Sequence, residues 1–286
     1  MNIKKHKMKT YSIYILMACL ISSLSFSQEA IRVKTQGNGQ PILLLPGFAN
    51  SSEVWEETVE NIEGKYQFHL VDYAGFNGLE PVSTPWLPKV QLALIEYVKA
   101  NDLKNLTIVG HSLGGTLALY LAAELQNHIK EIILVDALPN TSKLMFPNQE
   151  AGSFSYDNPY AKSQLEMPNE GFEQMIAQQL NMMCKNKDKH PLIKEWFIKS
   201  DRTTYVYGYI DYLNFNATPY LKNITSKVNI FSATNFGKER SQQVYETQYE
   251  TLESYTLLFA ENAAHYIMFD QPDWFYTEIN KILANG

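Results

Sequence analysis

The feature that most constrains the fold is one serine placed where a buried strand gives way to a helix. Residues 106–109 (Leu-Thr-Ile-Val) are apolar and β-branched, as a strand inside a sheet requires, and residues 116–125 are mostly Ala and Leu, which favour helix. Gly110-His-Ser-Leu-Gly-Gly115 stands between them. So sharp a turn strains the backbone and needs small neighbours, a requirement that glycine meets. We therefore predict that Ser112 is exposed at the end of a central strand as a catalytic nucleophile.

The length and composition indicate a globular protein. At 286 residues the chain can bury a sizeable core, and it suits one α/β domain with an inserted subdomain. Apolar residues make up 45% and charged residues 19%, which excludes a disordered chain. The formal net charge is −6, and no run of Lys or Arg follows residue 9, so we expect no nucleic-acid partner.

The N-terminus has the pattern of a secretory signal. Four lysines within the first nine residues precede an apolar stretch over residues 11–24, and small residues at 25 and 27 suit cleavage before Gln28. The apolar stretch is short for a helix that spans a bilayer. We predict a signal peptide over residues 1–27, an exported (periplasmic or secreted) protein, and no stable membrane span after processing.

A second route of processing stays open, because Leu16-Met-Ala-Cys19 is similar to a lipoprotein box. In that case Cys19 would be lipidated and become the new N-terminus. Cleavage before Gln28 instead leaves Cys184 as the only cysteine, which excludes an intramolecular disulfide. In that case we interpret Cys184 as a small apolar core residue.

Strand patterns alternate with helix patterns along most of the chain. This alternation predicts an α/β fold with a mostly parallel twisted sheet and helices on both faces. We expect an opening hairpin over residues 31–45, because a Gly-Asn-Gly turn separates its two apolar segments. The predicted units are a first core part over 28–138, a helical lid over 139–215 and a second core part over 216–286.

The lid is the segment where the alternation stops. It is rich in Tyr, Met, Asn and Pro, and helical patterns cover residues 171–185 and 192–200. Apolar lid side chains such as Met175, Trp196 and Tyr205 are candidates to line a substrate pocket. Packing within the lid's own core explains each of them equally well.

Four motifs in a fixed order relate the chain to a known family. They are Leu44-Leu-Pro-Gly-Phe48, Val71-Asp-Tyr-Ala-Gly-Phe76, the Gly110–Gly115 segment and Ala264-His-Tyr-Ile-Met268. On these motifs the chain resembles the α/β-hydrolase superfamily from about residue 31 to residue 283, apart from the lid. The resemblance implies an α/β-hydrolase fold with an inserted helical lid and a serine hydrolase of the carboxylesterase type.

The resemblance also implies roles for individual residues. Ser112 matches the nucleophile and His265 the base that takes its proton. The backbone N–H groups of Phe48 and Leu113 match the oxyanion hole, which stabilises the negative charge of the intermediate. No cofactor is implied, and no spacing of His, Cys or acidic residues suggests a metal site.

The family's catalytic site also contains an acidic residue that orients the histidine. The position of this acid departs from the family's common pattern in this chain. The loop that usually supplies an aspartate reads Ala233-Thr-Asn-Phe-Gly-Lys-Glu-Arg240 and contains none. Asp136 matches an alternative acid position found in relatives such as haloalkane dehalogenases, so we favour it. Glu239 is the second candidate, and a site without a functional acid is the third.

These observations favour an exported serine hydrolase that cleaves a small-molecule carboxylic ester through an acyl-enzyme. A lipase or acyltransferase that uses the same residues remains an alternative. So does a non-catalytic binding protein that has kept the fold, because fold alone does not guarantee activity. The sequence leaves the oligomeric state open.

Overall fold

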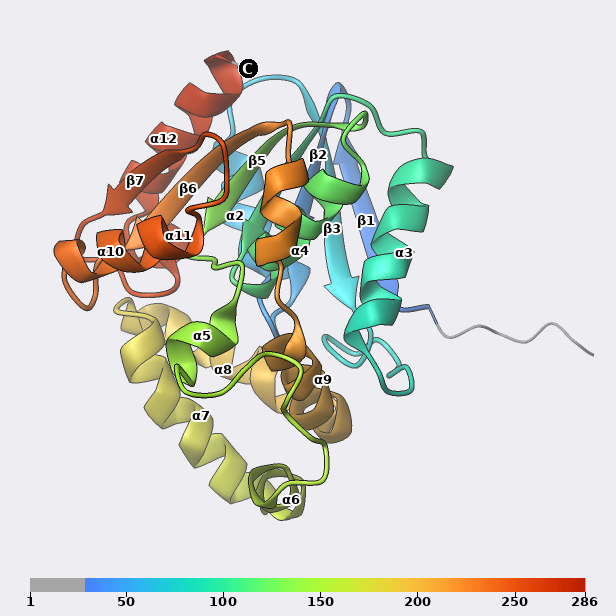
Figure 1. The fold of residues 1–286 in the computed structure, drawn as a ribbon, viewed down its shortest axis with the longest axis vertical. Coiled ribbons are helices and arrows are strands. Elements are labelled where there is room, and N and C mark those ends of the chain that lie inside the picture. Colours follow the sequence, from blue (N-terminus) through green and yellow to red (C-terminus); the bar gives the residue numbers. More distant parts are fainter. Residues whose placement is uncertain (1–28, 286) are drawn as a thin grey trace, which may run out of the picture.

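A seven-stranded sheet organises residues 29–285, the part of the chain that the computed structural model describes (Figure 1). The strand order is β1-β3-β2-β4-β5-β6-β7; β1 pairs antiparallel to β3, and all other neighbours are parallel. The predicted fold class is confirmed. The predicted signal peptide and Cys19 lie outside the described residues. The strands are β1 (Ile31–Gly37), β2 (Gln40–Leu45), β3 (Tyr66–Tyr73), β4 (Leu106–His111), β5 (Ile129–Val135), β6 (Lys227–Ala233) and β7 (Thr256–Ala260).

The predicted opening hairpin is wrong. β1 pairs with β3 and not with β2, which lies between β3 and β4. The physical reason is burial: residues 42–45 of β2 are fully buried, so this strand needs a neighbour on each side. β1 is polar and largely exposed along its second half, which suits the edge of the sheet.

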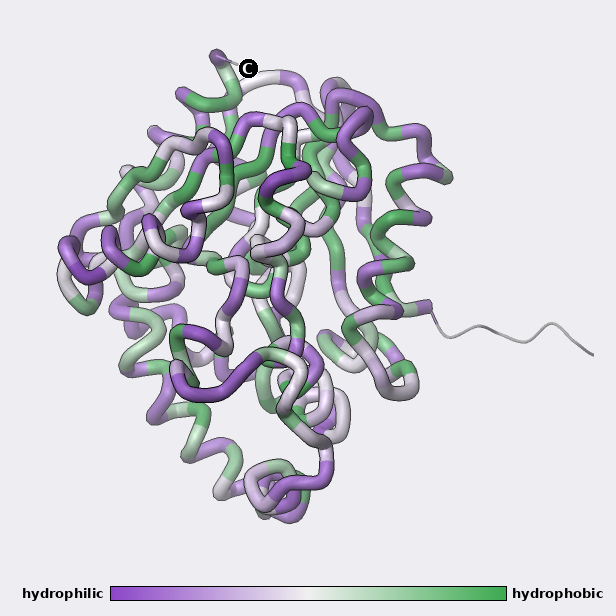
Figure 2. The backbone as a smooth tube through the Cα atoms, viewed as in Figure 1, coloured by the Kyte–Doolittle hydropathy of each residue, from purple (hydrophilic) through white to green (hydrophobic). Residues whose placement is uncertain are grey.

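Helices pack on both faces of the sheet (Figure 1). Figure 2 shows the strands as mainly hydrophobic and the outer helices as mixed. α4 differs from the other core helices because ten of its twelve residues are buried, as its Ala- and Leu-rich sequence requires. The core helices are α2 (Glu56–Asn61), α3 (Leu87–Ala100), α4 (Leu113–Glu124), α10 (Lys238–Gln248), α11 (Ile267–Asp270) and α12 (Pro272–Asn285), with short 3-10 helices at Ser52–Trp55 and Thr218–Asn223.

A group of helices between β5 and β6 forms a cap, defined here as residues 141–214. These helices gather at one end of the sheet, where the arrowhead of β3 points (Figure 1). They are α5 (Thr141–Met145), α6 (Pro159–Glu166), α7 (Asn169–Met183), α8 (His190–Ile198) and α9 (Arg202–Asn214), with a 3-10 turn at Lys187–Lys189. Within residues 29–285, no helix has the length and apolar character needed to cross a membrane.

The sequence patterns predicted α7 and α8 but missed α9. α9 contains four Tyr and two Thr among its thirteen residues, and these are modest helix formers, so tertiary contacts have to support it. Asp201 accepts a hydrogen bond from the Thr204 amide at its start. Asp211 accepts from the backbone N–H groups of Trp86 and Leu87, which tie α9 to the beginning of α3.

Candidate active site

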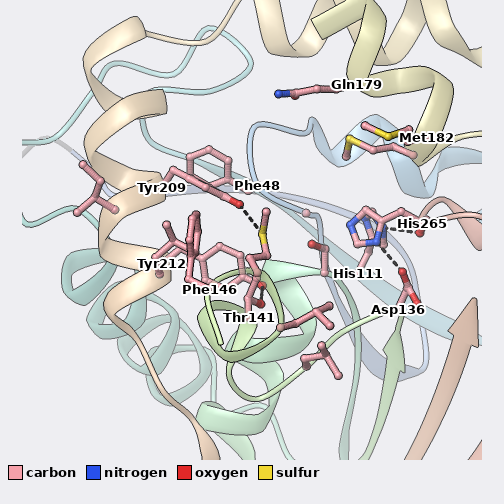
Figure 3. A pocket seen from close by; sticks show the side chains of 18 of the residues that line it. Phe48, His111, Asp136, Thr141, Phe146, Gln179, Met182, Tyr209, Tyr212 and His265 are labelled. Carbon is pink, nitrogen blue, oxygen red and sulfur yellow. Dashed lines mark hydrogen bonds and ion pairs between the residues drawn. The ribbon is translucent and has the colours of Figure 1, made fainter. Parts of the chain in front are cut away.

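A cavity of about 1140 Å³ lies between the sheet and the cap. Its core side is lined by residues that follow strands: Gly47 after β2, Ser112 after β4, Asp136 after β5 and His265 after β7. The carboxyl ends of parallel strands meet at one edge of a sheet, so residues far apart in sequence face the same space. The structure thus brings together the three residues predicted to act in catalysis; Figure 3 labels two of them, Asp136 and His265.

Ser112 stands on a strained turn. Its φ is 53°, in a region that side chains with a Cβ rarely occupy. The small neighbours are required for space: a Cβ on Gly114 would lie 2.2 Å from the Leu45 carbonyl oxygen, and one on Gly115 would lie 2.3 Å from the Ala137 Cβ. The glycines that marked this turn in the sequence therefore let α4 pack directly against β2 and β5.

His265 is held by Asp136. The His265 Nδ1 lies 2.7 Å from the Asp136 Oδ2, and the other carboxylate oxygen accepts from the Ala233 amide at 3.0 Å and the Tyr245 hydroxyl at 3.1 Å. A proton on Nδ1 faces the carboxylate, which leaves Nε2 free to accept another. Glu239, the second candidate acid, is exposed on α10 and does not line the cavity.

The His111 side chain contacts the backbone and the ring of His265. The sequence did not reveal this contact. The His111 Nε2 lies 3.0 Å from the His265 carbonyl oxygen, and the two ring centroids are 4.5 Å apart. Burial holds the His111 pKa well below its usual value, and the charge of His265 lowers it further. A neutral His111 donates from Nε2 to that carbonyl and so fixes the backbone that carries the base.

The loop that carries His265 is also tied to the cap. Asp270 accepts from the Ala264 amide at 2.7 Å with one oxygen, and from the amides of Lys185 and Asn186 with the other. The buried Cys184 thiol donates to the same carboxylate at 3.4 Å, and burial raises its pKa, so it stays protonated. This supports the prediction that Cys184 is a core residue, and it gives Asp270 a structural role.

Two backbone N–H groups have the environment expected of an oxyanion hole. Neither the Phe48 nor the Leu113 amide has a hydrogen-bond acceptor among residues 29–285. Leu113 is the first residue of α4, so its amide has no partner within the helix. The Phe48 ring lines the cavity and packs edge-on against Phe76 at 5.1 Å. The predicted donors are therefore available on the described chain.

Of the predicted pocket residues, Tyr205 lines the cavity, and Met175 and Trp196 do not. Trp196 is buried on the inner face of α8, where its indole N–H donates to Glu53 at 2.9 Å. Met175 packs against the hydrophobic core from α7. An amphipathic helix shows which face is buried but not whether that face meets a cavity or a packed core. Met182, another of the apolar lid side chains predicted to line a pocket, does line the cavity. The sequence missed other lining residues of the cap, among them Tyr209, Tyr212 and Phe146 (Figure 3).

The described residues hold no group of three or more His, Cys, Asp or Glu side chains arranged to bind a metal ion. The polar groups on the core side of the cavity include the Ser112 hydroxyl, the imidazoles of His111 and His265 and the Asp136 carboxylate. This set suits nucleophilic and acid–base chemistry.

Comparison with known proteins agrees with this geometry. A family model described as the alpha/beta hydrolase fold matches residues 40–165, which include β2 to β5 and the first part of the cap. An esterase from Exiguobacterium antarcticum superposes with a TM-score of 0.74 at 18% identity, over 89% of this chain and 95% of that one. The chain has the α/β-hydrolase fold. The enol-lactonase from Burkholderia xenovorans shares this fold at a TM-score of 0.73 and 14% identity, over 89% and 96% of the two chains.

Proteins related in sequence to this chain match over a shorter stretch than the solved structures do. A pimeloyl-(acyl-carrier protein) methyl ester esterase from Vibrio vulnificus is 28% identical over 106 residues, which is 37% of this chain and 40% of the relative. One from Nitrosospira multiformis is 30% identical over 119 residues, 41% and 45% of the two chains. The match thus spans less than half of the length of these curated relatives.

Proposed function

We propose that the chain is a serine hydrolase that cleaves carboxylic esters through Ser112, His265 and Asp136. The observation that carries the proposal is the 2.7 Å contact between His265 and Asp136 beside a strained serine, all three in one cavity. Relatives named as methyl ester esterases support the reaction class. Their names do not decide the substrate of this chain, because they match over less than half of their length.

The proposed reaction has two halves. The Ser112 Oγ attacks the ester carbonyl carbon as its proton passes to the His265 Nε2, and the carbonyl oxygen takes up the electron pair. The amides of Phe48 and Leu113 donate to that oxyanion. The carbon–oxygen bond to the alcohol then breaks, and the imidazolium returns the proton to the leaving alkoxide. Water repeats the sequence on the acyl-enzyme, which releases the acid and restores Ser112.

The walls of the cavity favour an apolar acyl group. Besides the two histidines, the charged residues that line it are Asp136 and Arg240. Six of the eight exposed large apolar side chains in residues 29–285 also line this cavity, so apolar surface continues to its mouth. They are Leu144, Met145, Phe146, Tyr160, Met182 and Phe236.

A series of p-nitrophenyl esters of increasing acyl length tests the proposal. One buried CH₂ group stabilises by about 0.8 kcal/mol, so each two added methylenes should raise kcat/KM about tenfold until the cavity is filled. Ser112→Ala is the matched control and should remove the turnover. Turnover that survives this substitution would contradict the proposal. A folded wild-type protein without turnover of any ester would favour a binding protein instead, and acyl transfer to an added alcohol in preference to water would favour an acyltransferase.

We also propose export, on the basis of the basic and apolar segments before Gln28. The mass of the mature protein recovered from cell fractions checks this. A chain that starts at Gln28 in the periplasm or medium supports the proposal, a lipidated chain that starts at Cys19 supports lipoprotein export, and an uncleaved cytoplasmic chain contradicts both.

A further inference from the structure

The cap places a phenol beside the nucleophile. Tyr212 lies in the last turns of α9 and is only 3% exposed, but it still lines the cavity. Its hydroxyl oxygen is 2.7 Å from the Thr141 Oγ1 and 3.3 Å from the Thr116 Oγ1. The Ser112 side chain lines the same cavity and lies near enough to the phenol to influence its pKa. Figure 3 shows Tyr212 reaching from its helix toward Thr141, on the side of the cavity opposite His265.

The direction of these hydrogen bonds follows from the partners of each hydroxyl. Thr116 donates its proton to the Leu138 carbonyl at 2.9 Å, so toward Tyr212 it can only accept. Within the described chain the Thr141 hydroxyl hydrogen-bonds to no side chain other than Tyr212. Its hydroxyl proton is therefore available for the phenol oxygen. The phenol proton then has the Thr116 oxygen as an acceptor at the longer distance of 3.3 Å. The nearby Ser112 side chain offers a second acceptor oxygen.

The phenol keeps its proton near neutral pH and can therefore donate a hydrogen bond. Burial raises the Tyr212 pKa, the hydroxyls of Thr116, Thr141 and Ser112 act against this, and the charge of Asp136 raises it again. The net direction is upward from a value already near 10. Tyr209, one turn earlier on α9, is different because its hydroxyl donates to the Met145 sulfur at 3.1 Å.

We propose that Tyr212 is a further catalytic residue, delivered by the cap, whose hydroxyl donates a hydrogen bond to the Ser112 Oγ. The inference rests on the proposed function. As the serine proton passes to the His265 Nε2, negative charge develops on Oγ, and the hydrogen bond from the phenol strengthens. The phenol keeps its proton throughout. Thr141 orients the phenol, which makes Thr141 a positioning residue.

Tyr212→Phe tests the proposal because it removes the hydroxyl and keeps the ring. The loss of one donor to a developing charge should lower kcat about 10- to 100-fold and leave KM within about twofold. The rate of labelling by a fluorophosphonate should fall in parallel. Tyr97→Phe is the control. It removes a tyrosine hydroxyl that lies 2.7 Å from the His69 ring of β3, outside the cavity, and its kinetics should match the wild type. An unchanged kcat in Tyr212→Phe overturns the inference.

Thr141 provides a second test that does not depend on the folding of the Tyr212 variant. Thr141→Val keeps the shape and removes the hydroxyl, so we expect kcat to fall about threefold or more, and Thr141→Ser should restore it. In a double-mutant cycle, Thr141→Val should add little once Tyr212 is Phe, because both act through one hydrogen bond. Equal loss in the Val and Ser variants would overturn the inference. A wild-type protein that neither turns over esters nor is labelled overturns the proposed function instead, so the two failures are distinguishable.

Discussion

The sheet core and the cap contribute to the cavity in different ways. The core supplies Ser112, Asp136 and His265 from loops at the ends of three strands, and close backbone packing fixes their places. The cap supplies most of the apolar wall from helices that are only partly buried. The family model ends at residue 165, inside the cap, so the shared sequence signal covers mainly the core.

This difference separates chemistry from selectivity. A change at the core end of the cavity should alter the rate for every ester, because all substrates share the same reacting atoms. A change in the cap should alter the rate according to the size of the acyl group. Tyr212 is the proposed exception, since it lies on the cap and we propose that its hydroxyl donates to the nucleophile.

The largest effect on kcat is expected for a change of Asp136, the acidic residue that the core supplies. Asp136→Asn keeps the shape but no longer holds the His265 ring in the right tautomer, so we expect kcat to fall about 10³- to 10⁴-fold for all esters. Steady-state kinetics on a short and a long ester measure this. Glu239→Gln is the control and should behave as the wild type, because this side chain is exposed and away from the cavity. A greater loss in Glu239→Gln would assign the acid to Glu239.

The next effect concerns stability and separates two glycines. Gly114→Ala places a Cβ 2.2 Å from the Leu45 carbonyl oxygen and should lower the free energy of unfolding by about 3 kcal/mol. Gly171→Ala in α7 meets only the flexible Met167 side chain, at 3.4 Å, and should raise it by about 0.5 kcal/mol. Urea unfolding of both variants checks this. Equal effects would show that the turn is not under steric constraint.

The third prediction uses the buried histidine of the core. Because the His111 pKa is lowered in the folded state, the unfolded chain binds a proton more readily below pH of about 6.5, and stability falls on acidification. The slope that one such histidine contributes is at most about 1.4 kcal/mol per pH unit. His69, whose pKa burial also lowers, contributes in the same direction.

His111→Gln should therefore be less stable than the wild type at pH 7.5 but lose less stability on going to pH 5.5. Urea unfolding at the two pH values measures this. An identical loss in both proteins would mean that folding does not lower the His111 pKa.

The smallest effect is expected at the rim of the cap. Met182 is 63% exposed at the cavity mouth, so Met182→Ser removes apolar surface that only a long acyl chain reaches. We expect KM to rise about two- to threefold for a long-chain ester and to stay unchanged for an acetate. Leu92→Ser is the control, because Leu92 is 56% exposed on α3 away from the cavity. An equal change for both esters would place Met182 outside the substrate path.

The sequence predicted the parts of the site that depend on local backbone geometry. Ser112 was identifiable because a turn this tight requires glycine at 114 and 115, and this requirement is visible in the order of residues. The sequence does not decide which carboxylate pairs with His265, because this depends on which loop reaches His265 in three dimensions. In the folded chain Asp136, and not Glu239, makes this contact.

The cap was predicted less well for a related reason. The pattern of α8 shows that Trp196 is buried, but the indole meets Glu53 and the core rather than the cavity. Tyr212 carries no local signal at all, since its role depends on how α9 lies over Ser112. The order of strands was also beyond local pattern, because the turn after β1 suggested a hairpin although β2 needed neighbours on both sides.

The most direct test of Ser112 as the nucleophile is to locate the adduct of a fluorophosphonate by peptide mass spectrometry. We predict one adduct per chain, on the Ser112 Oγ, formed much more slowly in Asp136→Asn than in the wild type. The absence of an adduct on the folded protein, or an adduct on another residue, would contradict this prediction.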